Sequence, residues 1–141
     1  MQSGNVIFKS NEENKSILKQ KIGKKIFDRF GFHVPVFITP AKELNIIFLN
    51  NPFLTDRSED IKFLHVTMLE NIPDQGLIDN LKSIQYGNDE YIIWEKTIFV
   101  FCPNGYGRIK LTNTFFENKL KTSTTTRNWK TITKLVELSS S

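Results

Sequence analysis

Two apolar runs separated by only two residues constrain the fold of this chain more than any other feature. The runs Tyr91–Trp94 and Thr97–Phe101 are rich in β-branched and aromatic residues, which favour strands, and Glu95-Lys96 lies between them. A connection this short indicates a tight hairpin of two antiparallel strands. A further strand is expected over residues 63–69. The sequence therefore predicts an antiparallel or mixed sheet.

Capping residues and helical periodicity predict the remaining elements. Ser10 begins a capping-box pattern, so a helix with one apolar stripe is expected over residues 11–30, with Gly31 as its C-cap. Thr39 is expected to cap a second helix that has Pro40 in its first turn and runs to residue 49. Further helices are predicted over residues 73–84, 109–120 and 128–138, strands over 6–8 and 34–38, and a threonine-rich bend over 122–126.

The order of these elements predicts the fold class. It is β-α-β-α followed by β-α-β-β-α-α, which is typical of an α+β protein rather than a doubly wound α/β protein. We expect the helices to pack on one face of the sheet, with halves that have a ferredoxin-like arrangement. Residues 54–60 are polar and are the best candidate for an internal boundary. The chain is therefore divided into an N-terminal α+β lobe, residues 1–56, and a C-terminal βαββαα lobe, residues 57–141.

Composition excludes several classes of protein. The single cysteine, Cys102, excludes an internal disulfide and a cysteine-based zinc site, and no metal-ligand spacing of histidines or carboxylates is present. No metal and no cofactor are therefore expected. No apolar run approaches the roughly 18 residues that a membrane span needs, and residues 1–4 lack the core of a signal peptide. We therefore expect a cytoplasmic protein with no membrane partner.

A basic excess in the last third of the chain points to an anionic partner. Residues 103–141 contain seven Lys or Arg and two Glu, a net charge of +5, whereas the whole chain carries +4. A local excess of this kind attracts anions, although a solvated helix face is the simpler interpretation.

Two segments in this basic third have the chemistry of an anion site. In the first, Asn104-Gly105-Tyr106-Gly107-Arg108 precedes a predicted helix, so glycines would bring the backbone close to a ligand near unpaired amides at the helix start. The spacing matches neither a P-loop nor a dinucleotide fingerprint. In the second, Thr126 or Asn128 can cap the last helix, Arg127 can bind an anion, and Trp129 can stack a base or sugar. The structural alternative is a simple turn, a helix cap and a tryptophan that anchors the last helices to the sheet. The predicted ligand-binding residues are Asn104, Gly105, Tyr106, Gly107, Arg108, Lys110, Asn113, Thr126, Arg127, Asn128 and Trp129.

Three functions remain open on these residues, and no catalytic residue is predicted. The favoured one is a binding module for an anionic ligand, either nucleic acid or a nucleotide-like metabolite. The second is an enzyme acting on a phosphorylated or carboxylated metabolite, which would need Tyr106, His65 or a carboxylate as acid or base. The third is a structural or interaction protein without a small ligand. His33 and His65 are expected to be structural, and Cys102 a small buried apolar residue.

Several short fragments, taken in order, resemble the bacterial proteins grouped as domain of unknown function 1697. The resemblance covers residues 2–138 and is specific as a combination. The fragments are residues 2–8 (QSGNVIF), 30–32 (FGF), 34–36 (VPV), 50–53 (NNPF), 64–67 (LHVT), 103–108 (PNGYGR), 110–113 (KLTN), 125–129 (TTRNW) and 133–135 (TKL).

The resemblance implies a small cytoplasmic α+β protein and no established activity, substrate or cofactor. The polar stretches typical of the family fall on residues 2–5, 104–108 and 125–129, two of which are the segments chosen above. Family members usually have a strand, an Arg-Gly loop and a helix before the segment that matches residues 2–8. The resemblance therefore implies an open sheet edge near that segment, and we expect either a homodimer formed through this edge or a truncated form of a longer protein.

Overall fold

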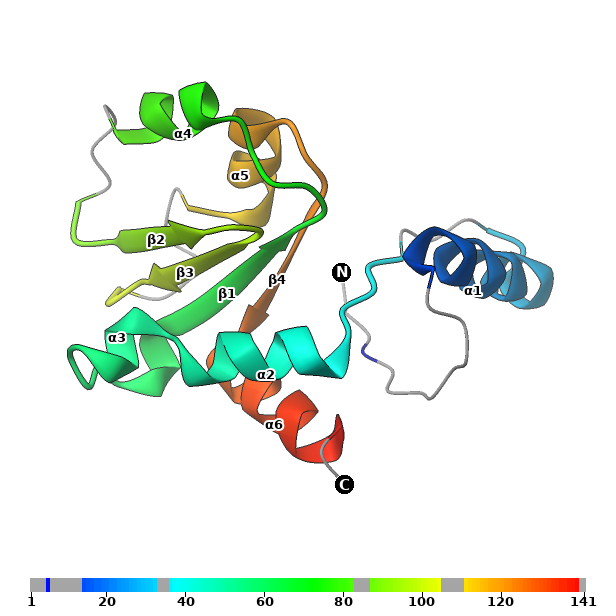
Figure 1. Ribbon diagram of the computed structural model, residues 1–141, viewed down its shortest axis with the longest axis horizontal. Helices are drawn as coiled ribbons and strands as arrows, with labels where there is room; N and C mark the ends of the chain where they lie inside the picture. Colours follow the sequence, from blue (N-terminus) through cyan, green and yellow to red (C-terminus); the bar gives the residue numbers. More distant parts are fainter. Residues whose placement is uncertain (1–4, 6–13, 33–35, 83–86, 105–110, 140–141) are drawn as a thin grey trace.

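The protein is built on a four-stranded antiparallel sheet with strand order β2-β3-β1-β4 (Figure 1). The strands are β1 (Leu64–Leu69), β2 (Glu90–Trp94), β3 (Thr97–Phe101) and β4 (Thr124–Asn128). The computed structural model describes residue 5 and residues 14–32, 36–82, 87–104 and 111–139. The predicted strand over residues 6–8, and with it the edge expected to form a dimer, lies outside these residues.

The hairpin expected from the sequence is confirmed. β2 pairs with β3 so that Trp94 faces Thr97, and Glu95 adopts a left-handed φ of 54° in the two-residue turn. β1 pairs with β3 on one side and with β4 on the other, and all of its residues except His65 are buried. β1 is thus an inner strand of the sheet, and the register of β3 and of β4 is defined by their pairing with it.

Helices cover both faces of the sheet. On one face lie α2 (Ala41–Leu49), α3 (Pro52–Thr55) and α6 (Trp129–Ser139), and on the other lie α4 (Gln75–Lys82) and α5 (Asn113–Leu120) (Figure 1). Each face has its own apolar core. The first contains Leu44, Ile47, Phe53, Leu64, Val66, Met68, Phe99, Trp129, Ile132 and Val136. The second contains Leu69, Leu81, Ile98, Val100, Cys102, Leu111, Phe116 and Leu120. The α+β class is confirmed, but the expectation of helices on one face only is wrong. β1 and β3 carry apolar residues on both faces, and both faces are therefore covered by helices.

Several local predictions also differ from the structure, and the helix predicted over residues 109–120 begins only at Asn113, with Thr112 as its N-cap. Residues 36–38 form no strand, and the segment leads directly into α2, whose N-cap is Pro40 rather than Thr39. The Thr39 hydroxyl instead lies 3.7 Å from the sulfur of Met68. The threonine-rich bend is strand β4, since five hydroxylated or polar side chains pair with β1 in full register.

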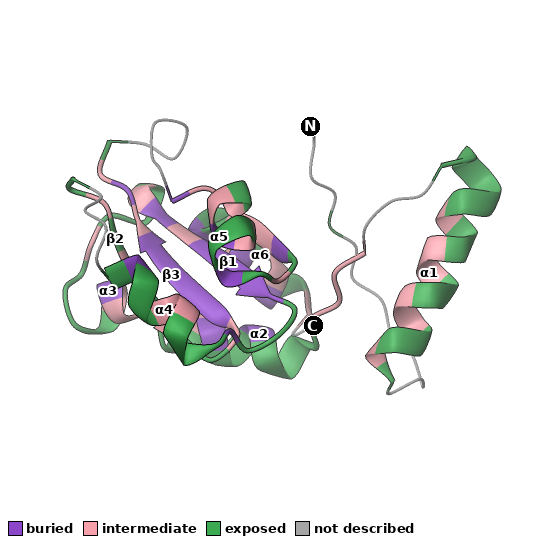
Figure 2. Ribbon diagram, turned by 90° about the horizontal axis from the view of Figure 1, so that it is seen from above, coloured by how far each residue is buried: buried purple, intermediate pink, exposed green. Residues whose placement is uncertain are grey.

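Helix α1 (Lys15–Phe30) lies to one side of these two cores (Figures 1 and 2). Asn14 caps its first turn by accepting hydrogen bonds from Ser16 and Ile17, and Gly31 ends it with a φ of 77°. None of its residues is buried, and it meets the body through the ion pairs Lys15–Glu43 and Lys19–Glu70. Among the described residues, no helix is both long and apolar enough to cross a membrane.

Arg57 ties the segment after α3 to the edge strand β2. Its guanidinium donates two hydrogen bonds to Glu90, of 2.9 and 2.8 Å, and one to Glu59 of 3.1 Å. The same group lies 5.2 Å from the ring centroid of Phe53 and 5.4 Å from that of Phe101. α3 thereby remains attached to the sheet. The lobe boundary at residues 56 and 57 stays a prediction, and α2 and α3 share one core with α6.

The Arg57–Glu90 pair predicts a pH dependence of stability. The hydrogen bond from Arg57 lowers the pKa of Glu90 below its ordinary value of 4.5. The stability that this pair contributes is therefore present above pH 4.5 and is lost as the pH falls through the lower folded pKa. We expect Arg57→Gln to lower the midpoint of thermal unfolding at pH 6.5 and to have a smaller effect at pH 3. The control is Lys62→Gln, which removes a 3.9 Å ion pair to Asp60 and a cation–π contact with Phe63. An equal effect of Arg57→Gln at both pH values would contradict the assignment.

Candidate functional site

The residues of β4 divide between the two faces of the sheet. Arg127 pairs with Val66, which belongs to the core of α2 and α6, so Arg127 projects to that side. Thr126 pairs with Thr67 and projects toward α5. Because β4 is an edge strand, Arg127 lies at the rim of the sheet rather than in its centre.

Neutral oxygen atoms hold the guanidinium of Arg127. Its Nε donates to the Asn5 side chain, and its Nη1 donates to the Thr125 hydroxyl and the Thr126 carbonyl, each at 2.8 Å. The group is half-buried, and this burial lowers the pKa of Arg127 from its ordinary value, although a guanidinium keeps its charge in proteins. No carboxylate among the described residues pairs with it. The result is a partly desolvated positive charge whose described partners are all neutral, an arrangement that favours a bound anion.

A chain of hydrogen-bonded, partly buried polar side chains lies on the opposite face of β4. The hydroxyls of Thr67 and Thr126 are 2.8 Å apart, and Thr126 donates to Asn113 Oδ1 at 3.0 Å. Asn113 in turn donates to the carbonyl of Thr124 at 3.3 Å. Thr112 caps α5 by accepting from Phe115 at 3.2 Å. These bonds fix the start of α5 beside β4, so Asn113 and Thr126, which come from the two predicted segments, are in direct contact.

Asn128 caps α6, as expected from the sequence. Its side-chain oxygen accepts a hydrogen bond of 2.8 Å from the backbone of Thr131. The next residue, Trp129, is only 3% exposed and stacks on Phe48, with ring centroids 5.5 Å apart and planes at 6°. The stacking role predicted for Trp129 is therefore wrong, because its indole is part of the core between α2 and α6. Trp129 is buried as the structural alternative expected, but it packs α6 against α2 and does not join the last two helices, which lie on opposite faces of the sheet.

Asn104 lies in the exposed turn after β3. β3 and β4 both run antiparallel to β1, with Phe101 opposite Leu64 and Asn128 opposite His65. The ends of these two strands are therefore at the same end of the sheet. The other predicted residues of this segment, Gly105, Tyr106, Gly107, Arg108 and Lys110, lie outside the described residues.

The contact between Asn5 and Arg127 was not predicted. The two residues are 122 positions apart, and no local pattern could pair them. The fragments used for the resemblance include both residues, at Gln2–Phe8 and Thr125–Trp129. The hydrogen bond between Asn5 and Arg127 therefore connects two of the three polar stretches typical of the family, residues 2–5 and 125–129.

Cys102 and His65 are neighbours, but they are not an activated pair. The Cys102 sulfur lies 3.8 Å from His65 Nδ1. Burial, with a smaller effect from Asp89, raises the pKa of Cys102 to about 12, and burial also lowers the pKa of His65. Both groups are therefore neutral near pH 7, whereas a nucleophilic cysteine needs a lowered pKa. In the described part of the chain, no group of three or more His, Cys, Asp or Glu side chains is arranged to hold a metal ion.

The site thus belongs to a small α+β protein with a polar rim at one end of an antiparallel sheet. Comparison with protein families gives a match over residues 1–99 to the family described as "Protein of unknown function (DUF1697)". The chain belongs to this family, as the resemblance indicated. No curated protein and no solved structure matches the chain. The match includes Asn5 and ends before Asn104 and β4.

The state of Cys102 predicts its reactivity. The side chain is fully buried and its pKa is raised to about 12, so we expect its alkylation by iodoacetamide at pH 8 to be at least about a hundredfold slower than in urea-unfolded protein. Mass spectrometry of the modified chain over time measures both rates. Equal rates in the folded and unfolded protein would show that the thiol is neither buried nor protonated as described.

Proposed function

We propose that this protein is a binding module for an anionic ligand, a nucleic acid or a nucleotide-like metabolite, and that Arg127 is its principal contact. The observation that supports the proposal most is the half-buried guanidinium, whose described partners are all neutral oxygens. A half-buried cation loses part of its hydration, and a phosphate or carboxylate would offset that loss.

The hydrogen bonds of Arg127 suggest how the anion binds. Nε and Nη1 are occupied by Asn5, Thr125 and Thr126, whereas Nη2 donates to none of the described residues. These bonds hold the guanidinium plane in place, so an anion would approach from the Nη2 side. Asn104, at the same end of the sheet, is exposed and would supply an amide close to the ligand.

Recognition would rest on charge rather than on base stacking. Trp129 is buried, so its ring is not exposed for a base to stack on. The phosphate group is therefore the part of a nucleic acid or nucleotide that we expect the protein to bind. Contacts to phosphate carry little sequence information, and their strength falls with salt.

The enzyme alternative has less support. A general acid or base must lie within reach of the bound anion. His65 pairs with Val100, which belongs to the core of α4 and α5, whereas Arg127 pairs with Val66 on the other face. The described histidine and the arginine thus project from opposite faces of the sheet. In the non-binding alternative, Arg127 would serve only to tie Asn5 to β4 through these hydrogen bonds.

Replacement of Arg127 tests the proposal. The probes are a fluorescein-labelled single-stranded 12-mer of mixed sequence, ATP and inorganic phosphate, titrated in 20 mM salt. We expect Arg127→Gln to weaken binding by about tenfold or more, because hydrogen bonds to a charged group contribute about 1.5–3 kcal/mol. Arg127→Lys, which keeps the charge but loses the planar donor fork, should be intermediate.

The matched control is Arg29→Gln, which removes an exposed arginine of α1 and the same net charge. Equal losses in Arg29→Gln and Arg127→Gln would indicate a general effect of charge and contradict a site at Arg127. Binding of the 12-mer should weaken as salt is raised from 20 to 200 mM. Failure of the wild-type protein to bind all three probes at 20 mM salt would overturn the proposal.

A further inference from the structure

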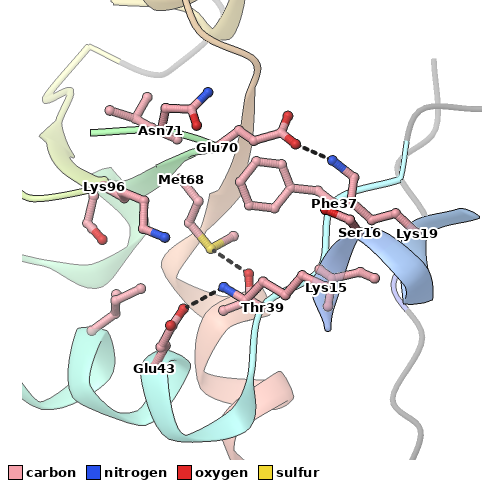
Figure 3. Close-up of a pocket in the computed structure, with 14 residues that line it drawn as sticks. Lys15, Ser16, Lys19, Phe37, Thr39, Glu43, Met68, Glu70, Asn71 and Lys96 are labelled. Atoms are coloured by element: carbon pink, nitrogen blue, oxygen red, sulfur yellow. Dashed lines mark hydrogen bonds and ion pairs between the residues drawn. The ribbon is translucent and has the colours of Figure 1, made fainter. Parts of the chain in front are cut away.

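A cavity of about 260 Å³ lies where β1 ends, beside the first turns of α1 (Figure 3). It is open to solvent on one side and is lined by the first turns of α1, the segment 37–39, α2, the end of β1 and the turn between β2 and β3. Arg127 and Asn128 are at the other end of β1, because β4 begins beside Leu69 and ends beside His65. None of the residues predicted as a site from the sequence lines this cavity.

The floor of the cavity is apolar. Ile47 and Met68 are core residues that are 6% and 8% exposed, and half-buried Phe37 packs against the same core. The Thr39 hydroxyl lies 3.7 Å from the Met68 sulfur and so faces this floor (Figure 3). An apolar group placed here would be removed from water at a gain of about 25 cal/mol for each Å² of its surface.

The rim of the cavity has an excess of positive charge. Lys15 pairs with Glu43 at 3.4 Å and Lys19 pairs with Glu70, so these four groups balance one another. Lys96 also lines the cavity, and its ammonium forms no ion pair with a carboxylate of the described chain (Figure 3). The amide of Leu69 donates a hydrogen bond of 2.8 Å to the carbonyl of Lys96, which holds the turn in place. Lys96 thus places a cation beside the apolar floor, on a turn whose backbone is held by β1.

We infer that this cavity binds a small amphiphilic anion, a carboxylate or phosphate monoester with a short apolar body. The apolar body would lie on Phe37, Ile47 and Met68, and the anionic group would face Lys96. Ligand pockets usually measure about 300–1,000 Å³, so a volume of 260 Å³ suits a small metabolite rather than a nucleotide. This site is separate from Arg127 and does not depend on the function proposed for that residue.

Four probes separate the contribution of the apolar group to binding from that of the anionic group. Phenylacetate and phenyl phosphate carry both an apolar ring and an anion, benzyl alcohol carries only the ring, and acetate carries only the anion. We expect the first two to bind in an NMR titration of the ¹⁵N-labelled full chain, shifting the amides of Thr39, Leu69 and Thr97. Benzyl alcohol and acetate should each bind at least about tenfold more weakly.

Variants then test the role of Lys96. Lys96→Gln should weaken phenylacetate binding by about threefold or more, the range expected for a partly exposed ion pair, and Lys96→Arg should restore most of it. The control is Lys134→Gln, which removes the same charge from an exposed residue of α6 that does not line the cavity. Arg127→Gln should leave the phenylacetate-induced shifts of the cavity amides Thr39, Leu69 and Thr97 unchanged, so failure of one site is distinguishable from failure of the other.

Three results would overturn the inference. Absence of shifts with phenylacetate and phenyl phosphate would show that the cavity binds neither. Equal binding of benzyl alcohol and phenylacetate would remove the role of the anion. Equal losses in Lys96→Gln and Lys134→Gln would assign the attraction to net charge rather than to this site.

Discussion

The burial of β1 on both faces is the constraint on which the rest of the structure depends. Leu64, Val66 and Met68 belong to the core of α2 and α6, whereas Leu69 belongs to the core of α4 and α5. A shift of one residue in register would exchange these faces and place His65 and Thr67 in the core of α2 and α6. Thr67, fully buried among them, is satisfied by the hydroxyl of Thr126. That pairing turns Thr126 toward α5 and therefore sends Arg127 to the other face, so the same register that forms the core also positions the candidate site.

The elements that could be predicted from the sequence are those with a strong local pattern. The hairpin of β2 and β3, the central strand and α6 have apolar periodicity and clear turn residues, and all three are present. β4 lacks such a pattern, because Thr124-Thr125-Thr126-Arg127-Asn128 contains no apolar residue. Its strand conformation comes from pairing with β1, which is distant in sequence. Residues 36–38 show the reverse case, since apolar residues that favour a strand have no strand partner in the described structure.

In the candidate site, too, features that depend on local sequence could be predicted, and features that depend on long-range contacts could not. Arg127 and the capping role of Asn128 could be predicted, because cation chemistry and helix capping depend on residue type and on near neighbours. The burial of Trp129 against Phe48 and the hydrogen bond from Arg127 to Asn5 could not, since both join segments that only the folded chain brings together. The cavity beside Lys96 is formed by five separate segments, and no local pattern in the sequence indicates it.

The central claim is that the guanidinium of Arg127 is held in place and open to an anion. The most direct measurement is the NMR signal of the Arg127 Nε–Hε group, titrated with inorganic phosphate. We expect a sharp signal that exchanges slowly with water, because Nε donates to Asn5 at 2.8 Å, and a saturable shift as phosphate binds. A signal that is averaged with those of exposed arginines, or that does not move with phosphate, would contradict the account.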